Sequence, residues 1–378
     1  MKKILCLLMA LLLCAGAALA ETEEAGAAPA PGEKLGFALL NELRAEGENV
    51  LISPLSLITA LAMAAEGAQG DTLEALLSAM GAENPGDVAA LVPEGVQGAN
   101  AAFARPDAQI RAEYIAALEE IFGAAQFEMD EDAMAAINDW VAEQTNGLIE
   151  NFLSEAPDPN ADLILLNALA MDAEWALPFA PERTEEADFH AANGDVSVDM
   201  MRAEEDYLYI ERDGAQLVCL PYADGKLEMW VALPSADGGM DMAALLNALS
   251  TDGLSALTAD AELTRVDLRL PKLDVSAGES LGEALCVLGL ELPFSDAAEF
   301  PGVSEDPMKI SEVIQKVRVQ IDEAGTRAAA ATAVTLAKMS MVMPEDVVEM
   351  AVDRPFAFAV ADSETGAVCF AGVVENPA

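Results

Sequence analysis

The sequence predicts an α+β fold made of one large domain, and three observations support this. Segments up to about residue 153 repeat apolar residues at spacings of three and four, which is typical of helices. Beyond Asp162 the pattern changes to short runs of β-forming residues separated by Gly, Asp and Pro. No polar linker divides the two halves, and 53% of the 378 residues are hydrophobic, which is enough for a sizeable core.

The first twenty residues have the features of a secretory signal peptide. Lys2 and Lys3 precede an apolar run at residues 4–20, and the run ends in the small-residue pattern Ala-Leu-Ala. We therefore expect residues 1–20 to be a signal peptide that is cleaved after Ala20, and the mature protein to be secreted to the extracellular space.

Two alternatives for this segment are disfavoured. A membrane anchor would need a longer apolar run, and acidic residues follow Ala20 almost at once. Attachment of a lipid at Cys14 would make the protein a lipoprotein, but Leu13 stands where a small residue is preferred.

Residues 21–32 are expected to form a flexible leader, because they mix acidic residues with Ala, Pro and Gly and show no apolar period. Residues 33–378 then form the single domain. Gly81 and Gly147 stand where helices should end or turn. The predicted helices lie in the segments LGFALLNELRA, LSLITALAMAAEGA, DTLEALLSAMG, DAMAAINDWVAEQTNGLIENFL and, later in the chain, SLGEALCVLGL.

The predicted strands are LILLNALAM, YLYIERDG, QLVCLPY, LEMWVALP and VDLRLPKL, which are rich in β-branched, aromatic and other apolar residues and end at turn residues. The C-terminal segment DRPFAFAVADSETGAVCFAGVV reads as two further strands, joined by a hairpin at Thr365 and Gly366.

The formal net charge is −47, from 66 acidic and 19 basic residues. A surface covered in carboxylates repels polyanions, so nucleic acid is excluded as a partner and heparin is disfavoured. Two explanations of the charge stay open: it keeps the protein soluble, or it steers a basic partner protein toward it.

The sequence offers no support for an enzyme or a metal site. Its single histidine, His190, must carry any Ser-His-Asp mechanism alone, and no G-x-S-x-G, P-loop, dinucleotide or HExxH motif is present. Asp158, Asn160 and Asp162 form half of a calcium loop, but its glycine and closing glutamate are missing. Beyond the signal peptide the cysteines lie in apolar segments and read as core residues: Cys219, Cys286 and Cys369.

Residues 49–72, NVLISPLSLITALAMAAEGAQGDT, resemble the N-terminal helix and shutter pattern of the serpins, the serine protease inhibitor family. INDWVAEQTNGLI, LLNALAMDAEWALPF, TEEADFH, LPKLDV and DRPFAFAV follow the same family in the same order, so the resemblance covers nearly all of residues 33–377. It implies a bacterial-like secreted serpin with N-terminal helices, three mixed β-sheets and an exposed reactive-centre loop at about residues 323–350. It also implies a monomer that needs no cofactor.

The segment that follows residue 322 resembles the hinge E-E-G-T-E-A-A-A-A-T of inhibitory serpins, except at Ala324 and Arg327. Taken alone, TRAAAATAVTLAKM would be read as a helix. The resemblance instead favours an exposed loop that becomes a strand after cleavage. The hinge positions are Glu323, Gly325, Thr326, Ala328, Ala329, Ala330, Ala331 and Thr332.

Strand geometry predicts which side chains of this loop face the core after insertion. Successive side chains of a strand point to opposite faces, so if Thr326 faces the core after insertion, Ala328 and Ala330 do too. Arg327, the charged residue among them, then faces solvent.

The resemblance also implies roles for residues outside the hinge. Ser53, Ser56 and Asn167 would form a shutter that gates opening of the sheet, beside Gln315, which stands where serpins often have histidine. Glutamine can both donate and accept a hydrogen bond. At the top of the sheet, the region called the breach, Trp175 is expected, together with an ion pair between Glu323 and Lys272.

Met339 stands fourteen residues beyond Gly325, at the family's usual spacing for the reactive bond, and Ser340 follows it. This bond suits serine proteases with an apolar primary pocket, of the elastase, chymotrypsin or subtilisin kind. A bond between Lys338 and Met339 would suit a trypsin-like protease, and a cysteine protease is a further alternative. The rival functions are a non-inhibitory serpin that binds or chaperones other molecules and, more remotely, a secreted hydrolase.

Overall fold

The computed structural model describes residues 28–93, 96–104, 107–127, 132–158, 161–326 and 347–378. The expected signal peptide lies outside these residues. Within them no helix is long and apolar enough to cross a membrane.

The helices predicted in the N-terminal half are present, and α2 is the most buried of them. Ser53 caps α2 with its side chain, Pro54 occupies the first turn, and every residue of the helix is buried. The helices of this half are α1 (Glu33–Leu43), α2 (Pro54–Ala65), α3 (Gly70–Met80), α4 (Pro85–Ala89), α5 (Ala112–Phe122) and α6 (Ala133–Gln144). The later ones are α7 (Met242–Asp252), α8 (Leu254–Thr258) and α9 (Gly282–Val287), with short 3-10 turns η1 (Pro181–Arg183) and η2 (Leu292–Phe294).

Two predictions about this half need correction, and a third is confirmed in part. In the segment predicted to be helical at residues 132–153, α6 ends at Gln144, and the predicted turn at Gly147 is present, because Asn146 and Gly147 both adopt left-handed backbone conformations (φ 49° and 76°). Strand β2 (Val96–Ala104) crosses a region predicted to be mostly helical. The leader was expected to be flexible up to residue 32, but Ala30 donates its N–H to Glu33 and Gly32 donates to the Met80 carbonyl, so its last residues are fixed.

The larger of the two sheets contains the strands predicted after residue 200. Its order is β1 (Val50–Ile52), β16 (Val368–Val374), β15 (Phe356–Asp362), β9 (Leu227–Leu233), β8 (Ala215–Pro221), β7 (Gly194–Arg212), β10 (Glu262–Pro271) and β14 (Val348–Ala351), with β6 (Glu185–Ala191) also paired to β7. Gly366 has φ 73° in the β15–β16 turn, where the sequence predicted a hairpin.

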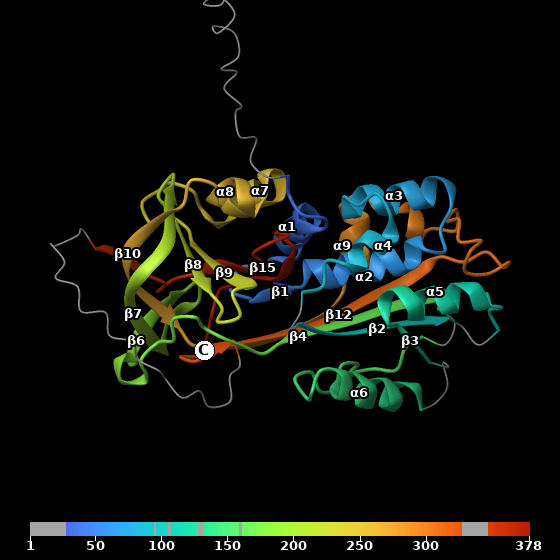
Figure 1. The fold of residues 1–378 in the computed structure, drawn as a ribbon, viewed down its shortest axis with the longest axis horizontal. Helices are drawn as coiled ribbons and strands as arrows, with labels where there is room; N and C mark the ends of the chain where they lie inside the picture. The colour runs from blue at the N-terminus through green and yellow to red at the C-terminus, as the bar shows by residue number, and fades with distance from the viewer. Residues whose placement is uncertain (1–27, 94–95, 105–106, 128–131, 159–160, 327–346) are drawn as a thin grey trace, which may run out of the picture.

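The second sheet runs through the middle of the molecule (Figure 1). Its order is β3 (Ala125–Gln126), β2, β4 (Leu163–Met171), β12 (Ile310–Ile321), β13 (Gly325–Thr326) and β5 (Ala173–Glu174), with β11 (Leu273–Ser280) paired to β12. Helices α2 and α6 cover its opposite faces (Figure 1), so every residue of β4 is buried.

Three separate sheets were expected, whereas the described residues form two. The reason is the length of β7, which spans 19 residues. One part of β7 pairs with β6 and β10, and its C-terminal part pairs with β8, so strands expected in two sheets are joined in one.

Candidate functional site

The central sheet has a seam where β4 and β12 lie side by side in parallel. We use seam for this pair of strands, which are in register from Glu312 opposite Ile164 to Val317 opposite Leu169, after an irregularity that follows Ile310. Neighbouring pairs in the sheet, such as β2 with β4, are antiparallel. Parallel ladders are slightly weaker per residue than antiparallel ones, so the seam is held less strongly by its backbone than the antiparallel pairs beside it.

A row of three amide side chains crosses the seam. Gln315 of β12 lies opposite Asn167 of β4, and Asn167 lies opposite Asn100 of β2. Gln315 and Asn167 are both only 3% exposed. Buried amides are costly unless their donors and acceptors are paired, so this row must be hydrogen-bonded to be stable.

Residues at the start of α2 form hydrogen bonds with both strands of the seam. Gln315 accepts a hydrogen bond from the Ser53 N–H at 2.7 Å and donates one to the Ser53 carbonyl at 2.9 Å. Ser56 donates its hydroxyl to the Asn167 side-chain carbonyl, and Asn167 donates its amide to Asn100. Separation of β4 from β12 must therefore break or rearrange contacts at the first turn of α2.

The structure brings together the four residues named for the shutter from sequence. Gln315 uses both its donor and its acceptor toward Ser53. Asn100 was missed, because its place in the row depends on the register of β2 against β4, and no local pattern in the sequence reveals that register.

At the C-terminal end of β12 the chain turns back and begins a new strand. Asp322 accepts hydrogen bonds from the N–H groups of Ala324 and Gly325, which forms a tight turn. Strand β13 then lies between β12 and β5, with Thr326 opposite Ile321 on one side and Ala173 on the other. It is antiparallel to both neighbours, so Gly325 and Thr326 of the hinge are already part of the sheet.

Gly325 is required at this turn by the close approach of two backbones. A Cβ atom at Gly325 would lie 2.1 Å from the Ala173 carbonyl oxygen and 2.7 Å from the Glu174 Cα. Neither atom belongs to a flexible side chain, so a larger residue would push β13 out of the gap.

Thr326 faces the core, at only 3% exposure. Its hydroxyl lies 2.6 Å from the hydroxyl of Tyr222, which is itself buried. Tyr222 stacks on Trp175 with ring centroids 4.6 Å apart. The role of Tyr222 was missed, because a tyrosine in the apolar run LVCLPY reads as a core residue.

Trp175 supports the turn that carries the hinge. Its ring nitrogen donates to the Asp322 carbonyl at 3.0 Å, and its backbone N–H donates to the Ala324 carbonyl at 2.8 Å. Trp175 therefore holds the turn before Gly325 through two hydrogen bonds, and its ring also packs against the buried Tyr222.

Glu323 and Lys272 form an ion pair at the breach, with Lys272 Nζ 2.9 Å from Glu323 Oε1. Thr184, which sequence reasoning did not assign, donates its hydroxyl to the same carboxylate at 2.8 Å. Burial alone would raise the pKa of Glu323, but the hydrogen bonds from Lys272 and Thr184 outweigh it and hold the pKa below its usual value. The hydrogen bond to Glu323 raises the pKa of Lys272.

These two shifts predict how the breach responds to pH. Because the pKa of Glu323 is depressed, its contribution to stability is full above its unfolded value of about 4.3 and is lost as the pH falls through the folded value. The raised pKa of Lys272 gives a contribution that persists below its unfolded value of about 10.4 and is lost at higher pH. We expect Glu323→Gln to reduce the free energy of unfolding by about 1–2 kcal/mol between pH 5 and 9.

Urea unfolding of wild type and Glu323→Gln across pH measures this. The difference between them should shrink as the pH falls below about 4.3, because the carboxylate in the unfolded wild type is then protonated and the ionised folded form loses its advantage. Asp296→Asn is the matched control, because its pair with Lys309 has a similar distance (2.7 Å) but a carboxylate that is 93% exposed. A Glu323→Gln difference that stays constant down to pH 3 would contradict the ion-pair explanation.

The remaining sequence-predicted positions lie outside the described residues. They are the hinge residues Ala328–Ala331 and Thr332 and the reactive-bond residues Lys338, Met339 and Ser340. The chain is described again from Val347, just before β14.

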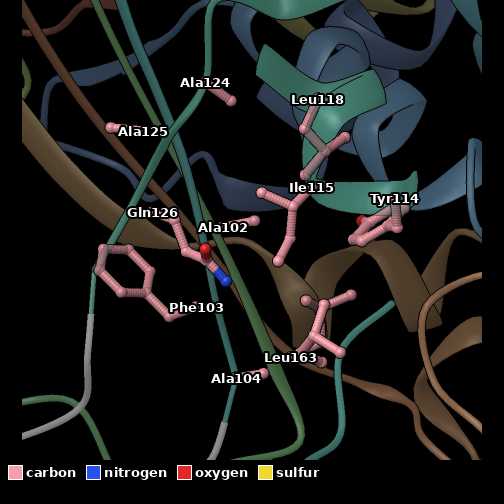
Figure 2. Close-up of a pocket in the computed structure, with 11 residues that line it drawn as sticks. Ala102, Phe103, Ala104, Tyr114, Ile115, Leu118, Ala124, Ala125, Gln126 and Leu163 are labelled. Atoms are coloured by element: carbon pink, nitrogen blue, oxygen red, sulfur yellow. The ribbon is translucent and has the colours of Figure 1, made fainter. Parts of the chain in front are cut away.

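Two other features lie away from the hinge and the shutter. His190 is exposed on the β6–β7 hairpin, where its ring pairs with Asp195 at 2.8 Å. An apolar pocket lies beside the seam, between α5 and the strands β2, β3 and β4 (Figure 2). Only Gln126 and Tyr114 bring polar side-chain atoms to its lining, and Tyr114 donates its hydroxyl to the Met63 carbonyl.

Comparison with known proteins gives one consistent result. The family model described as serpin (serine protease inhibitor) matches residues 31–377. An uncharacterized serpin-like protein of Thermococcus kodakarensis is 32% identical over 90% of this chain and 84% of its own length. The native-state crystal structure of tengpin, a thermophilic serpin, superimposes with a TM-score of 0.81 at 28% identity and covers 91% of this chain and 93% of tengpin.

Human thyroxine-binding globulin in complex with thyroxine gives the same TM-score of 0.81 at 25% identity, over 92% of this chain and 97% of the globulin.

Proposed function

This chain belongs to the serpin family, whose members are not enzymes, and from that premise we propose that it is a secreted inhibitor that traps serine proteases. The target cleaves the reactive loop as if it were a substrate. The cleaved loop then inserts into the seam between β4 and β12, and the attached protease is carried with it.

The observation that carries this proposal is the position of β13. Its two residues lie antiparallel to β12 and to β5, beyond the C-terminal end of the seam. If β13 were extended between β4 and β12, two antiparallel ladders would replace the one parallel ladder. At about 1 kcal/mol net per hydrogen bond, about ten new ladder bonds would favour the inserted form by on the order of 10 kcal/mol.

The proposed chemistry at the reactive bond is that of any serine protease substrate. The protease serine attacks the carbonyl carbon of Met339, and the bond between that carbon and the Ser340 nitrogen breaks. The protease histidine gives its proton to the leaving amine. An ester then joins Met339 to the protease, and trapping succeeds when the loop inserts before water hydrolyses that ester.

We expect elastase or subtilisin to form a covalent complex with this protein and to release a peptide that begins at Ser340. The side chain of Met339 suits the apolar primary pocket of both proteases. Denaturing gel electrophoresis detects the complex, and N-terminal sequencing of the released peptide identifies the bond. Protease whose serine has been blocked is the control, and it should give neither product.

Each other outcome of that experiment has a defined meaning. A peptide beginning at Met339 would move the reactive bond to Lys338 and favour trypsin-like targets. Cleavage only upstream of Thr335 would contradict the assignment of the loop. Cleavage without a stable complex would contradict trapping and favour a non-inhibitory binding protein, the alternative to which human thyroxine-binding globulin gives weight as a similar fold that binds thyroxine.

A further inference from the structure

The outer face of β7 and β10 carries an apolar pair that no other part of the described chain covers. Leu208 of β7 lies directly opposite Leu263 of β10, and they are 41% and 71% exposed. Val347, at 44% exposure, immediately precedes β14, which pairs with β10 on its other side. We call Leu208, Leu263 and Val347 the outer patch; it lies at the end of the molecule formed by β7 and β10 (Figure 1).

The outer patch is not explained by the fold. Along β10 the inward positions, Val266 and Leu268, are fully buried, so Leu263 occupies an outward position where a polar residue would serve the sheet equally well. The described residues contain eight large hydrophobic side chains that are exposed, and three of them form this patch. Clustered apolar side chains on a surface mark an interaction site more often than scattered ones do.

The charges around the outer patch indicate the partner's character. Arg265, two residues along β10 from Leu263, lies within 4 Å of three carboxylates: Glu204 at 3.4 Å, Asp206 at 3.5 Å and Glu205 at 3.7 Å. One guanidinium cannot neutralise three carboxylates, so this side of the outer patch stays negative. An apolar patch with an acidic border fits a partner with an apolar surface and basic residues beside it.

The reactive loop connects this surface to the protease. Residues 340 and 347 are separated by seven peptide units, which span at most about 25 Å when fully extended. A protease of about 200–250 residues has a radius of gyration of about 17 Å, so its body is wider than that distance. A protease held at the reactive bond is therefore within reach of the outer patch.

We propose that the outer patch is a second docking surface for the target protease, which contacts it with an apolar surface bordered by basic residues. This inference rests on the proposed function, because it assumes that a protease is captured at the loop. Its effect is on encounter: contacts at the patch hold the protease near the loop and raise the rate of complex formation, while loop insertion after cleavage is unaffected.

The test compares wild type, Leu263→Ser and Val287→Ser against the protease that wild type traps fastest. Val287 is a matched control, because it is 63% exposed at the end of α9, outside the outer patch. We expect Leu263→Ser to lower the second-order rate constant of complex formation about tenfold, with the stoichiometry of inhibition unchanged. Val287→Ser should equal wild type. The wild-type rate should also fall as salt is added, because the acidic border is then screened.

The possible failures are distinguishable. If wild type traps no protease, the proposed function fails. If wild type traps its target and Leu263→Ser does so at the same rate, only the docking surface is overturned. Sedimentation showing a wild-type dimer that Leu263→Ser abolishes would assign the outer patch to a second copy of the chain and would also overturn the proposal.

Discussion

Replacing Thr326 with arginine is expected to turn this protein from an inhibitor into a substrate without unfolding it. Thr326 is 3% exposed and its hydroxyl contacts Tyr222, so an arginine there would be buried without a partner for its charge. Such burial costs several kcal/mol. The short strand β13 can avoid that cost by leaving the gap, since among the described residues two are paired there, and the rest of the domain keeps its contacts.

Trapping is a race between insertion of the loop and hydrolysis of the ester, and each 1.4 kcal/mol added to the insertion barrier slows it about tenfold. We therefore expect Thr326→Arg to be cleaved at the wild-type bond and to release active protease. The number of inhibitor molecules consumed per protease should rise about tenfold or more. Titration of residual protease activity measures this number, and sequencing of the released peptide shows that the bond is the same.

Two variants serve as controls for the side-chain direction. Thr326→Val keeps the shape and loses only the hydrogen bond to Tyr222, so it should remain an inhibitor. Arg327→Glu changes the charge at the next position, which faces solvent after insertion if the alternation of a strand holds, and it should change little. Stable complex formation by Thr326→Arg at the wild-type stoichiometry would refute both the strand register and trapping by insertion.

The sequence was sufficient for the fold where its signals are local. Ser53 and Pro54 begin α2, apolar β-forming runs bounded by turn residues give the strands, and Gly366 marks the last hairpin. The sequence-based prediction was wrong where a segment has no clear local preference for helix or strand. The strand β2, VQGANAAFA, is rich in Ala and Gly and becomes a strand because it pairs along its whole length with the buried β4.

The residues of the candidate site likewise fall into those that the sequence predicted and those that it did not. The hinge and shutter residues were predicted by resemblance, since they stand in recognisable segments. Asn100, Tyr222 and Thr184 were not, because each acts through a contact between strands or turns that lie far apart in the chain. From the sequence alone, the inward direction of the Thr326 side chain could only be assumed. It is fixed by the pairing of β13 with β12 and β5 and by the hydroxyl of Tyr222.

The shutter leads to the second large effect. We expect Gln315→Leu to lower the free energy of unfolding by about 2–4 kcal/mol. Leucine has nearly the volume of glutamine but cannot accept the Ser53 N–H, which is then left buried without a partner. The Ser53 carbonyl keeps its bond from the Leu57 N–H, so only its second hydrogen bond is lost. Urea unfolding measured by circular dichroism gives the free-energy difference.

Two further variants separate the hydrogen bonds of Gln315 from its mere presence on β12. Gln320→Leu changes a half-buried glutamine on the same strand, away from the amide row, and should alter stability by less than about 0.5 kcal/mol. Gln315→His keeps one donor and one acceptor, so it should recover part of the loss. If Gln315→Leu is as stable as wild type, the bonds between Gln315 and Ser53 do not hold β12 to α2. The closed seam must then depend on other contacts, such as the backbone ladder between β4 and β12, and Gln315 would have no gating role.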